Sequence, residues 1–566
     1  MLHGSLLLHE ANFSTYKAFE DLTEIIPLPP ENLSQGKQKA TPHHESGPLV
    51  VLTFDEAHTI TQRQLATNDE WTIFNELCYA LRHLNRLPLF SLFLSTTGKI
   101  SQFTSPTEED LSKRVVMREL FLIQPYTDLG FDSLARRVTV DGSQNLEELT
   151  GDSQTCSLGR PFQRHLKGSE TVKQEIIQFA VAKLLNANKA TDNLSNDQLL
   201  ACLSQRFPIE FNSTNYISQE KERKQVEGHM RVCLKIDATL ETMTTTSSSE
   251  PILSEAAYYV MQRQSFNAPR ALQLVMDGFS ISKGDRGEFL VLLLLILARD
   301  ATVGPADELG QPIAGKRWFS LTDFLYGCTF RKQSRRSHLV DKKSISALGQ
   351  LLTDFPNAQL HFNHFVKVHE HKAINIISLL LLQGRGAAVL CGNSQAGVDA
   401  INVFLKSGTR LARDNAGLIL HQIKNDSRYS TRPQQELFDA MNPYELKILR
   451  EGDPAVPLIK IVFALAAKAP SLHVVRHNQS EGYRNVIYEI WCAGISPDIL
   501  GAIEQQQVDI WKSLLQASYG WQELYKTTSG EAADLRRSAT PGAAADIGHY
   551  SCWVESPELQ TLLSLE

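Results

Sequence analysis

Two short, uninterrupted apolar runs with a helical segment between them set the strongest limit on what the N-terminal part of this chain can fold into. The runs cover residues 49–54 (LVVLTF) and 89–94 (LFSLFL), and the segment centred on residues 71–84 has the pattern of a helix. Strands that are apolar on both faces are typical of parallel sheets, which helices cover on both sides. The order strand, helix, strand therefore predicts an α/β fold with a parallel sheet.

The composition limits which partners and which cellular compartment can be expected for the chain. The chain has 566 residues and a net charge of −7, so attraction to a polyanion must come from local basic patches. The eight cysteines form no CxxC pair, which favours a reducing, intracellular compartment, with the nucleus among the expected locations. The N-terminus lacks the basic region of a signal peptide. The longest apolar run, residues 289–298, is too short to span a bilayer, so a buried helix and no membrane partner are expected.

The pattern along the chain predicts four parts: an NTPase-like domain at 1–150, a helical region at 151–345, a second α/β domain at 346–510 and a tail at 511–566. The Ser/Thr-rich residues 241–250 are expected to be a linker, and residues 536–547 have a disordered composition. In the second α/β domain a helix is expected at 362–382, with strands at 387–391, 397–404, 418–424, 459–465 and 486–492 and a short helix at 436–441.

Three polar residues fall at the ends of predicted strands in this second domain. Asp399 begins one strand, and Gln422 and Lys424 lie two apart on another, so their side chains share one face. A carboxylate and an amide oxygen can hold Mg²⁺, and a lysine can offset negative charge that develops on a phosphate. The sequence therefore predicts metal-assisted phosphodiester hydrolysis, with Asp399 and Gln422 as metal ligands.

This arrangement resembles the PD-(D/E)XK nuclease superfamily, and within it the Mrr-like enzymes with a QxK motif. The matching pieces are Glu370, Gly384, the Gly397-Val398-Asp399 tripeptide and the Gln422-Ile423-Lys424 tripeptide. The resemblance implies a restriction-endonuclease-like domain that acts on DNA with Mg²⁺. In it Asp399 is the main ligand, Lys424 the catalytic lysine, and Glu370 an acid supplied by a helix.

The first apolar run is followed by Asp55 and Glu56, in the sequence LVVLTFDEAH, which has the form of a Walker B strand. In that interpretation Asp55 and Glu56 serve Mg²⁺ and the attacking water, and Ser95 after the second run is a sensor. No GxxxxGK[ST] motif is present, so a degenerate or truncated P-loop domain is expected, with little binding or hydrolysis of ATP. The alternative is that Asp55 and Glu56 only begin the next helix.

The two halves together resemble the NTPase-plus-nuclease proteins of the Crinkler effector class of fungi and oomycetes. The similar pieces are FDEAH, LSTTGKI, LGRPF, HFNHFVKV and HQIKN. The resemblance implies a toxin-like or mobile-element-derived DNA endonuclease. A nucleic-acid-binding or regulatory protein that has lost catalysis is the alternative.

Two further patterns concern binding. Residues 331–343 are basic and could contact phosphates, or form a solvated loop. His361, His364, His369 and His371 lack the spacing of a zinc site, and we expect them on a helix surface or near DNA.

Overall fold

The computed structural model describes most of the chain between Val50 and Ser518. The described residues are 17, 50–61, 72–84, 89–95, 103, 110, 113–119, 123, 125–127, 130–160, 176–187, 192–211, 216–237, 242–276, 286–329, 339–392, 397–426, 428–477 and 485–518. They belong to two compact units. The first comprises residues 1–126 with 235–243, and the second comprises 127–234 with 244–566.

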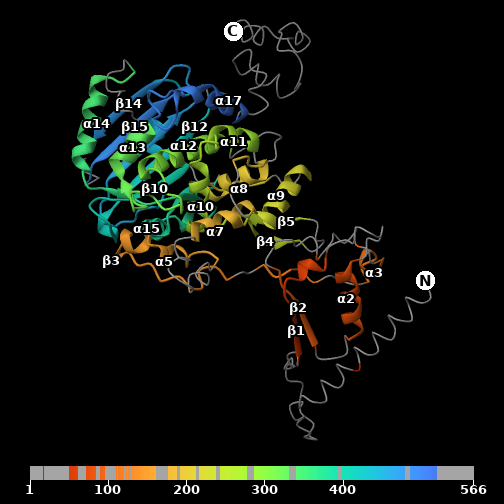
Figure 1. Ribbon diagram of the computed structural model, residues 1–566. Coiled ribbons are helices and arrows are strands. Elements are labelled where there is room, and N and C mark those ends of the chain that lie inside the picture. The colour runs from red at the N-terminus through yellow and green to blue at the C-terminus, as the bar shows by residue number, and fades with distance from the viewer. Residues whose placement is uncertain are drawn as a thin grey trace, which may run out of the picture. The chain divides into compact units, whose positions relative to one another are not determined.

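The first unit contains the predicted strand, helix, strand order (Figure 1). Strands β1 (Val50–Phe54) and β2 (Leu89–Phe93) pair in parallel, as the two apolar runs predict. Helix α2 (Ile73–His83) begins at a capping box formed by Thr72 and Asn75, and Phe74 packs edge-on against Phe93 at 5.0 Å between ring centroids. A short 3-10 helix η1 (Ala57–Thr59) follows β1, and α3 (Lys113–Val116) lies further along the chain.

The second unit is built on a nine-stranded mixed sheet. Its principal strand order is β14-β15-β13-β12-β10-β7-β6, and β9 pairs with both β10 and β8. β10 is antiparallel to both of its neighbours β9 and β12, whereas β13 runs parallel to β12 and β15 parallel to β13. The bounds are β6 (Phe319–Ser320), β7 (Gln359–Leu360), β8 (His364–Val368), β9 (Ala387–Cys391), β10 (Ala400–Leu405), β12 (Ala416–Lys424), β13 (Leu458–Ala464), β14 (Ser471–His477) and β15 (Ile487–Ala493).

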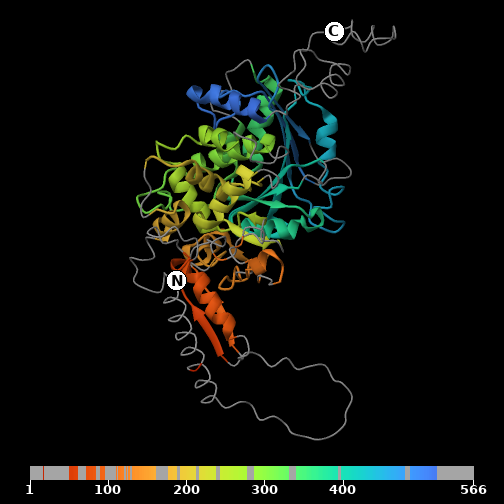
Figure 2. The same ribbon diagram turned by 90° about the vertical axis from the view of Figure 1, so that its right-hand side faces the viewer.

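Helices cover both faces of this sheet. Figure 2 shows the yellow and green helices as a layer on one side of the teal and blue strands. That layer comprises α7 (Ile176–Leu185), α8 (Asn196–Arg206), α10 (Pro251–Met261), α11 (Ala268–Met276), α12 (Arg286–Val303), α13 (Leu321–Thr329), α14 (Lys342–Asp354) and α17 (Val508–Ser518). The opposite face carries α4 (Leu146–Leu149), α15 (Ile376–Gly384) and α16 (Gln435–Ala440). Among the described residues, the remaining α-helices are α5 (Asp152–Thr155) and α9 (Tyr216–Gly228), and the remaining strands form the pairs β3 (Asp141–Asn145) with β11 (Arg410–Ala412) and β4 (Val232–Ile236) with β5 (Met243–Thr246). Further 3-10 helices are η8 (His371–Ala373), η9 (Arg413–Asn415) and η10 (Gln505–Gln507).

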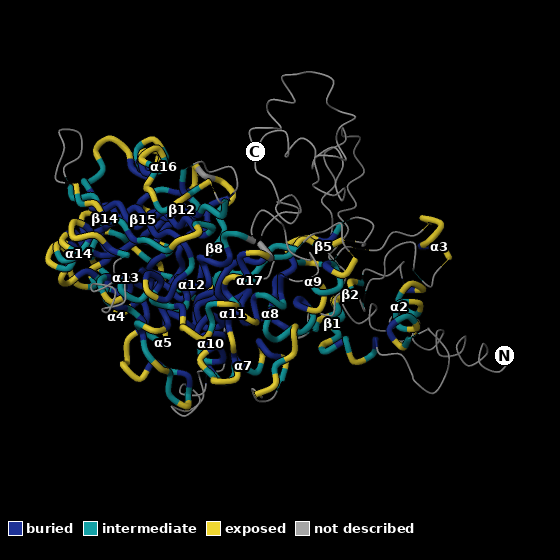
Figure 3. Tube along the Cα trace, turned by 90° about the horizontal axis from the view of Figure 1, so that it is seen from above, coloured by how far each residue is buried: buried dark blue, intermediate teal, exposed yellow. Residues whose placement is uncertain are grey.

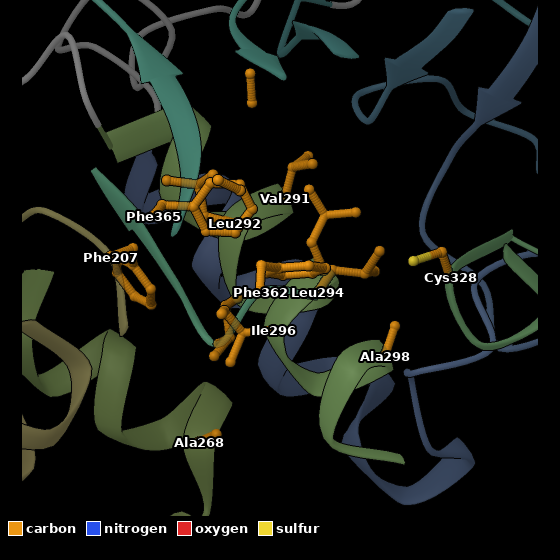
Figure 4. Close-up of a cluster of buried hydrophobic side chains, with 14 of the residues drawn as sticks. Phe207, Ala268, Val291, Leu292, Leu294, Ile296, Ala298, Cys328, Phe362 and Phe365 are labelled. Atoms are coloured by element: carbon orange, nitrogen blue, oxygen red, sulfur yellow. The ribbon is translucent and has the colours of Figure 1, made fainter. Parts of the chain in front are cut away.

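Helix α12 lies at the centre of the larger core. Its residues 289–296 are all at most 2% exposed, as expected for a helix that is apolar on every side. Figure 4 shows Leu292 and Leu294 of α12 beside Phe362 and Phe365, which come from the sheet side. Figure 3 shows α12 and the central strands as buried. No helix among the described residues has the length and apolar character needed to cross a membrane.

Three predictions about elements differ from the structure. The expected helix at 362–382 is instead strand β8 followed by the shorter α15, because residues 364–368 pair in parallel with β9. The expected linker at 241–250 contains β5, and its hydroxyls bind charged groups: Arg231 donates to Thr245 Oγ1 at 2.5 Å. The helical region and the second α/β domain form one compact unit, which begins at Thr127 rather than near 150.

A buried network of charges joins the helical layer to the sheet through the HFNHF segment. Arg206 donates to the Asn363 carbonyl at 2.7 Å, and Arg299 donates to the Phe362 carbonyl at 3.0 Å. Arg299 also pairs with Glu255 at 2.9 Å, and Asn363 donates to that carboxylate at 2.6 Å. Burial opposes the charge of Glu255, but Arg299 and its other partners outweigh burial and lower the pKa of Glu255 to about 2. The segment therefore locks the two layers together.

Candidate functional site

Asp399 lies at the start of β10, between two neighbouring strands. Its N–H donates to the His421 carbonyl at 2.8 Å, and its own carbonyl accepts from the Cys391 N–H at 2.8 Å. Gly397 precedes it with φ of +85°, and a Cβ there would lie 2.4 Å from the Ala440 carbonyl oxygen. Only glycine fits this turn without strain, which explains the glycine of the GVD tripeptide.

The register of the sheet brings the three predicted residues together. The antiparallel β10–β12 ladder begins at the Ala400–His421 pair, and Asp399 comes just before it. Asp399 bonds β12 on either side of Gln422, through its N–H to the His421 carbonyl and through Oδ2 to the Ile423 N–H. Lys424 is two residues beyond Gln422 and shares its face of β12, and its charge acts on Asp399. Asp399, Gln422 and Lys424 thus form a single cluster, which we call the edge site.

The surroundings of Asp399 disfavour its negative charge. Burial raises the pKa of Asp399, and this effect exceeds the opposing contributions of the Ile423 N–H and of the Lys424 ammonium. The Ile423 N–H donates to Asp399 Oδ2 at 2.5 Å. A carboxylate in such a place is stabilised when a further cation binds beside it.

Gln422 presents an oxygen that protein groups do not satisfy. The residue is 4% exposed, and within the described part of the chain its Oε1 has no hydrogen-bond partner. Leaving such an acceptor buried costs about 1–3 kcal/mol. Asp399 bonds the main chain of the residues before and after Gln422, and a carboxylate and an amide oxygen are ligands that a hard cation prefers.

The acid expected from a helix is not where the sequence placed it. Glu370 is exposed in the connection between β8 and α15, and it belongs to neither element. The apolar residues after Phe362 predict a helix that would include Glu370, but the helix that forms, α15, begins only at Ile376. β8 is separated from β10 by β9, so Glu370 emerges two strands away from Asp399.

Another acid, Glu288, lies near the edge site. It is in the first turn of α12, next to Gly287, where a Cβ would lie 3.5 Å from Nδ2 of Asn425, the residue after β12. Burial, followed by the charges of Asp399 and Glu288, raises the pKa of the Cys391 thiol. The same thiol therefore lies within electrostatic range of both carboxylates. No local sequence signal marks Glu288, because only packing of α12 brings it to the sheet.

In the first unit the structure brings together the residues of the Walker-B-like run. Asp55 accepts the Glu56 N–H at 2.9 Å, and Glu56 has a φ of +50°. His58 Nδ1 lies 3.1 Å from Glu56 Oε2 and 3.1 Å from Ser95 Oγ, at the end of β2. Glu56 is the N-cap residue of η1, and its side chain makes no capping bond to that helix.

The histidines have structural roles that the sequence did not predict. Burial lowers the pKa of His361 to about 4 and that of His364 to about 3, so both are neutral at pH 7. His364 bonds Asn363 at 2.6 Å and Ser249 at 2.7 Å. They belong to the interior and not to a helix surface, whereas His369 is largely exposed.

The basic residues 331–338 and the segment 536–547 lie outside the described residues. Among the residues that the structure describes, no group of three or more His, Cys, Asp and Glu side chains is placed to hold a metal ion. Comparison with family models, curated proteins and solved structures gave no match for this chain.

Proposed function

We propose that the second unit is a Mg²⁺-dependent DNA endonuclease whose reaction takes place at the edge site. The observation that carries the proposal is the buried Gln422 Oε1, which has no partner among the described residues and belongs to the residue between the two that bond Asp399. Asp399 and Gln422 would hold the ion. When bound, Mg²⁺ polarises the phosphate and acidifies a coordinated water.

The protein groups have distinct tasks in this proposal. Asp399 supplies the negative charge of the ligand set, and its main-chain bonds to β9 and β12 fix its position. Gln422 supplies a neutral oxygen from a rigid central strand. Lys424 is partly exposed at the end of β12, where its ammonium offsets the negative charge that develops on the phosphate.

The order of elements supports the same proposal. Helix α15, the antiparallel strands β9, β10 and β12, helix α16 and the parallel strand β13 follow each other along the chain. The GVD tripeptide enters β10 and the QIK tripeptide ends β12, which is the arrangement of helix, hairpin, GxD and QxK that the Mrr-like resemblance implies. The turn glycine with positive φ between α15 and β9 is Gly386 rather than Gly384.

We further propose that Glu288 takes the place that the sequence assigned to Glu370. Its charge acts at Cys391, whose N–H donates to the Asp399 carbonyl, whereas Glu370 projects from the far side of β9. A second carboxylate at the edge site would compensate for the charge that glutamine lacks as a ligand.

Cleavage of supercoiled plasmid in Mg²⁺ tests the proposal. Asp399→Asn and Lys424→Ala should each lower the cleavage rate by about 100-fold or more. Glu288→Gln should lower the rate and raise the Mg²⁺ concentration needed for half-maximal cleavage. Glu370→Gln is the matched control and should leave both unchanged.

Two results would change the assignment. Equal cleavage by wild type and Asp399→Asn would exclude the edge site as the centre of reaction. Binding of DNA without cleavage by the wild type would favour the alternative, a nuclease-derived binding protein. The Walker-B-like cluster of the first unit, and with it the kinship to Crinkler-type proteins, remains a hypothesis that rests on Asp55, Glu56 and Ser95.

A further inference from the structure

Two loops next to the edge site carry exposed cations. Residues 425–434 connect β12 to α16 and expose Arg428 and Arg432, and residues 465–470 connect β13 to β14 and expose Lys468. Lys424 and Ala464 are register partners at the ends of the parallel strands β12 and β13. Both loops therefore leave the sheet at the edge where Asp399 and Lys424 lie.

The first of these loops is fixed to the sheet by its main chain. Trp491 Nε1 donates to the Ser430 carbonyl at 3.0 Å, and Ser471 Oγ donates to the Thr431 carbonyl at 3.3 Å. The second bond also ties this loop to the start of β14, where the Lys468 loop ends. The cationic side chains consequently project from an ordered support, which reduces the entropy lost when they bind a ligand.

The ion pair of Arg428 does not prevent such binding. Arg428 Nε lies 3.0 Å from Asp426 Oδ2, and the side chains are 79% and 34% exposed. Exposed pairs of this kind contribute about 0–1 kcal/mol, so exchange of the carboxylate for a phosphate costs little.

We propose that Arg428, Arg432 and Lys468 form a basic rim that binds the phosphodiester backbone of the DNA on one side of the edge site. The inference rests on the proposed function and adds the surface along which the substrate lies. A protein with a net charge of −7 needs such a local patch to approach a polyanion.

Binding measured without cleavage tests the rim. The parent is the full chain with Asp399→Asn, in EDTA, and the probe is a fluorescein-labelled DNA duplex whose anisotropy is followed from low to high NaCl concentration. The rim variant adds Arg428→Gln, Arg432→Gln and Lys468→Gln. The control variant adds Lys406→Gln, Arg410→Gln and Arg450→Gln, of which Lys406 follows β10, Arg410 begins β11 and Arg450 lies in the connection that precedes β13.

Loss of three phosphate contacts should reduce the slope of log K against log salt by about 2.7, and the control should keep the slope of the parent. If the parent binds the duplex and the rim variant keeps its slope, the rim is excluded while the nuclease proposal stands. Equal losses in both triple variants would also exclude it, because they would show a general effect of charge. A parent that binds no duplex at any salt concentration would refute the proposed function, and the rim with it.

Discussion

Replacement of Gln422 by methionine should make the metal-free protein more stable and remove its response to Mg²⁺. The two side chains have similar volume and length, so the packing of β12 against β10 and β13 is preserved. What changes is the buried Oε1, which has no partner within the described part of the chain. In the wild type, folding removes that oxygen from water without giving it a donor among the described residues, and in the proposed function only a bound cation compensates for this loss.

The size of the effect follows from these two states. A buried, unsatisfied acceptor costs about 1–3 kcal/mol, so Gln422→Met should raise the free energy of unfolding in EDTA by about that amount, less any packing loss. Mg²⁺ at ten times its Kd should stabilise the wild type by about 1.4 kcal/mol and the variant by nothing. The difference in free energy of unfolding between the two proteins should therefore shrink or change sign as Mg²⁺ is added.

Thermal unfolding followed by tryptophan fluorescence, in EDTA and in MgCl₂, measures both effects. Gln383→Met is the matched control. Gln383 is also a buried glutamine whose Oε1 has no partner among the described residues, but its Nε2 donates to the Val403 carbonyl at 3.1 Å. It should lose stability in EDTA and keep the Mg²⁺ response. A Gln422→Met protein that is still stabilised by Mg²⁺ would show that the ion binds elsewhere.

Three further predictions address the interior and the first unit. Burial lowers the pKa of His421 to about 3, so stability falls as pH decreases from 6.5, and His421→Phe should flatten that fall by about 1.4 kcal/mol per pH unit in urea titrations. The depressed pKa of Glu255 means that its contribution is lost as pH falls from 4.5 towards 2, and Glu255→Gln should remove this loss while costing about 3–5 kcal/mol at pH 7, since Arg299 stays buried. The first unit should show no saturable micromolar binding of ATP in a calorimeter, because the chain has no P-loop motif.

The local sequence pattern was sufficient to predict an element where the spacing of apolar and polar residues alone determines the secondary structure. The continuous apolar runs predicted β1 and β2 and their parallel pairing. The expectation that helices cover both faces was wrong for these two strands, since Val51, Phe90 and Leu92 are exposed on one face. The spacing of Gln422 and Lys424 placed both on one face of β12. Their proximity to Asp399 comes from the antiparallel pairing of β10 with β12, which leads Asp399 to the main chain of residues 421 and 423.

Prediction failed where distant segments decide the outcome. Residues after Phe362 are apolar enough for a helix, but pairing of β8 with β9 overrides that preference. Arg206 and Arg299 of the helical layer bond the main chain between His361 and His364 and hold that segment in the interior. No residue near the histidines in the sequence indicates these contacts. Glu288 is more than a hundred positions from Asp399 along the chain, and its approach depends on how α12 packs.

The edge site is distinguished by the convergence of unfavourable features, not by any single one. Unpartnered buried oxygens occur elsewhere in the described residues, as at Gln383, and buried charges occur as at Arg299. The Gln383 side chain still donates a hydrogen bond from Nε2 to a main-chain carbonyl, and Arg299 is paired with two carboxylates. At the edge site, the carboxylate whose pKa is raised by burial bonds the main chain on both sides of Gln422, whose buried oxygen has no donor among the described residues. In the proposed function both costs would be relieved by the same event, the binding of a cation, and the Lys424 ammonium would then attract an anionic substrate.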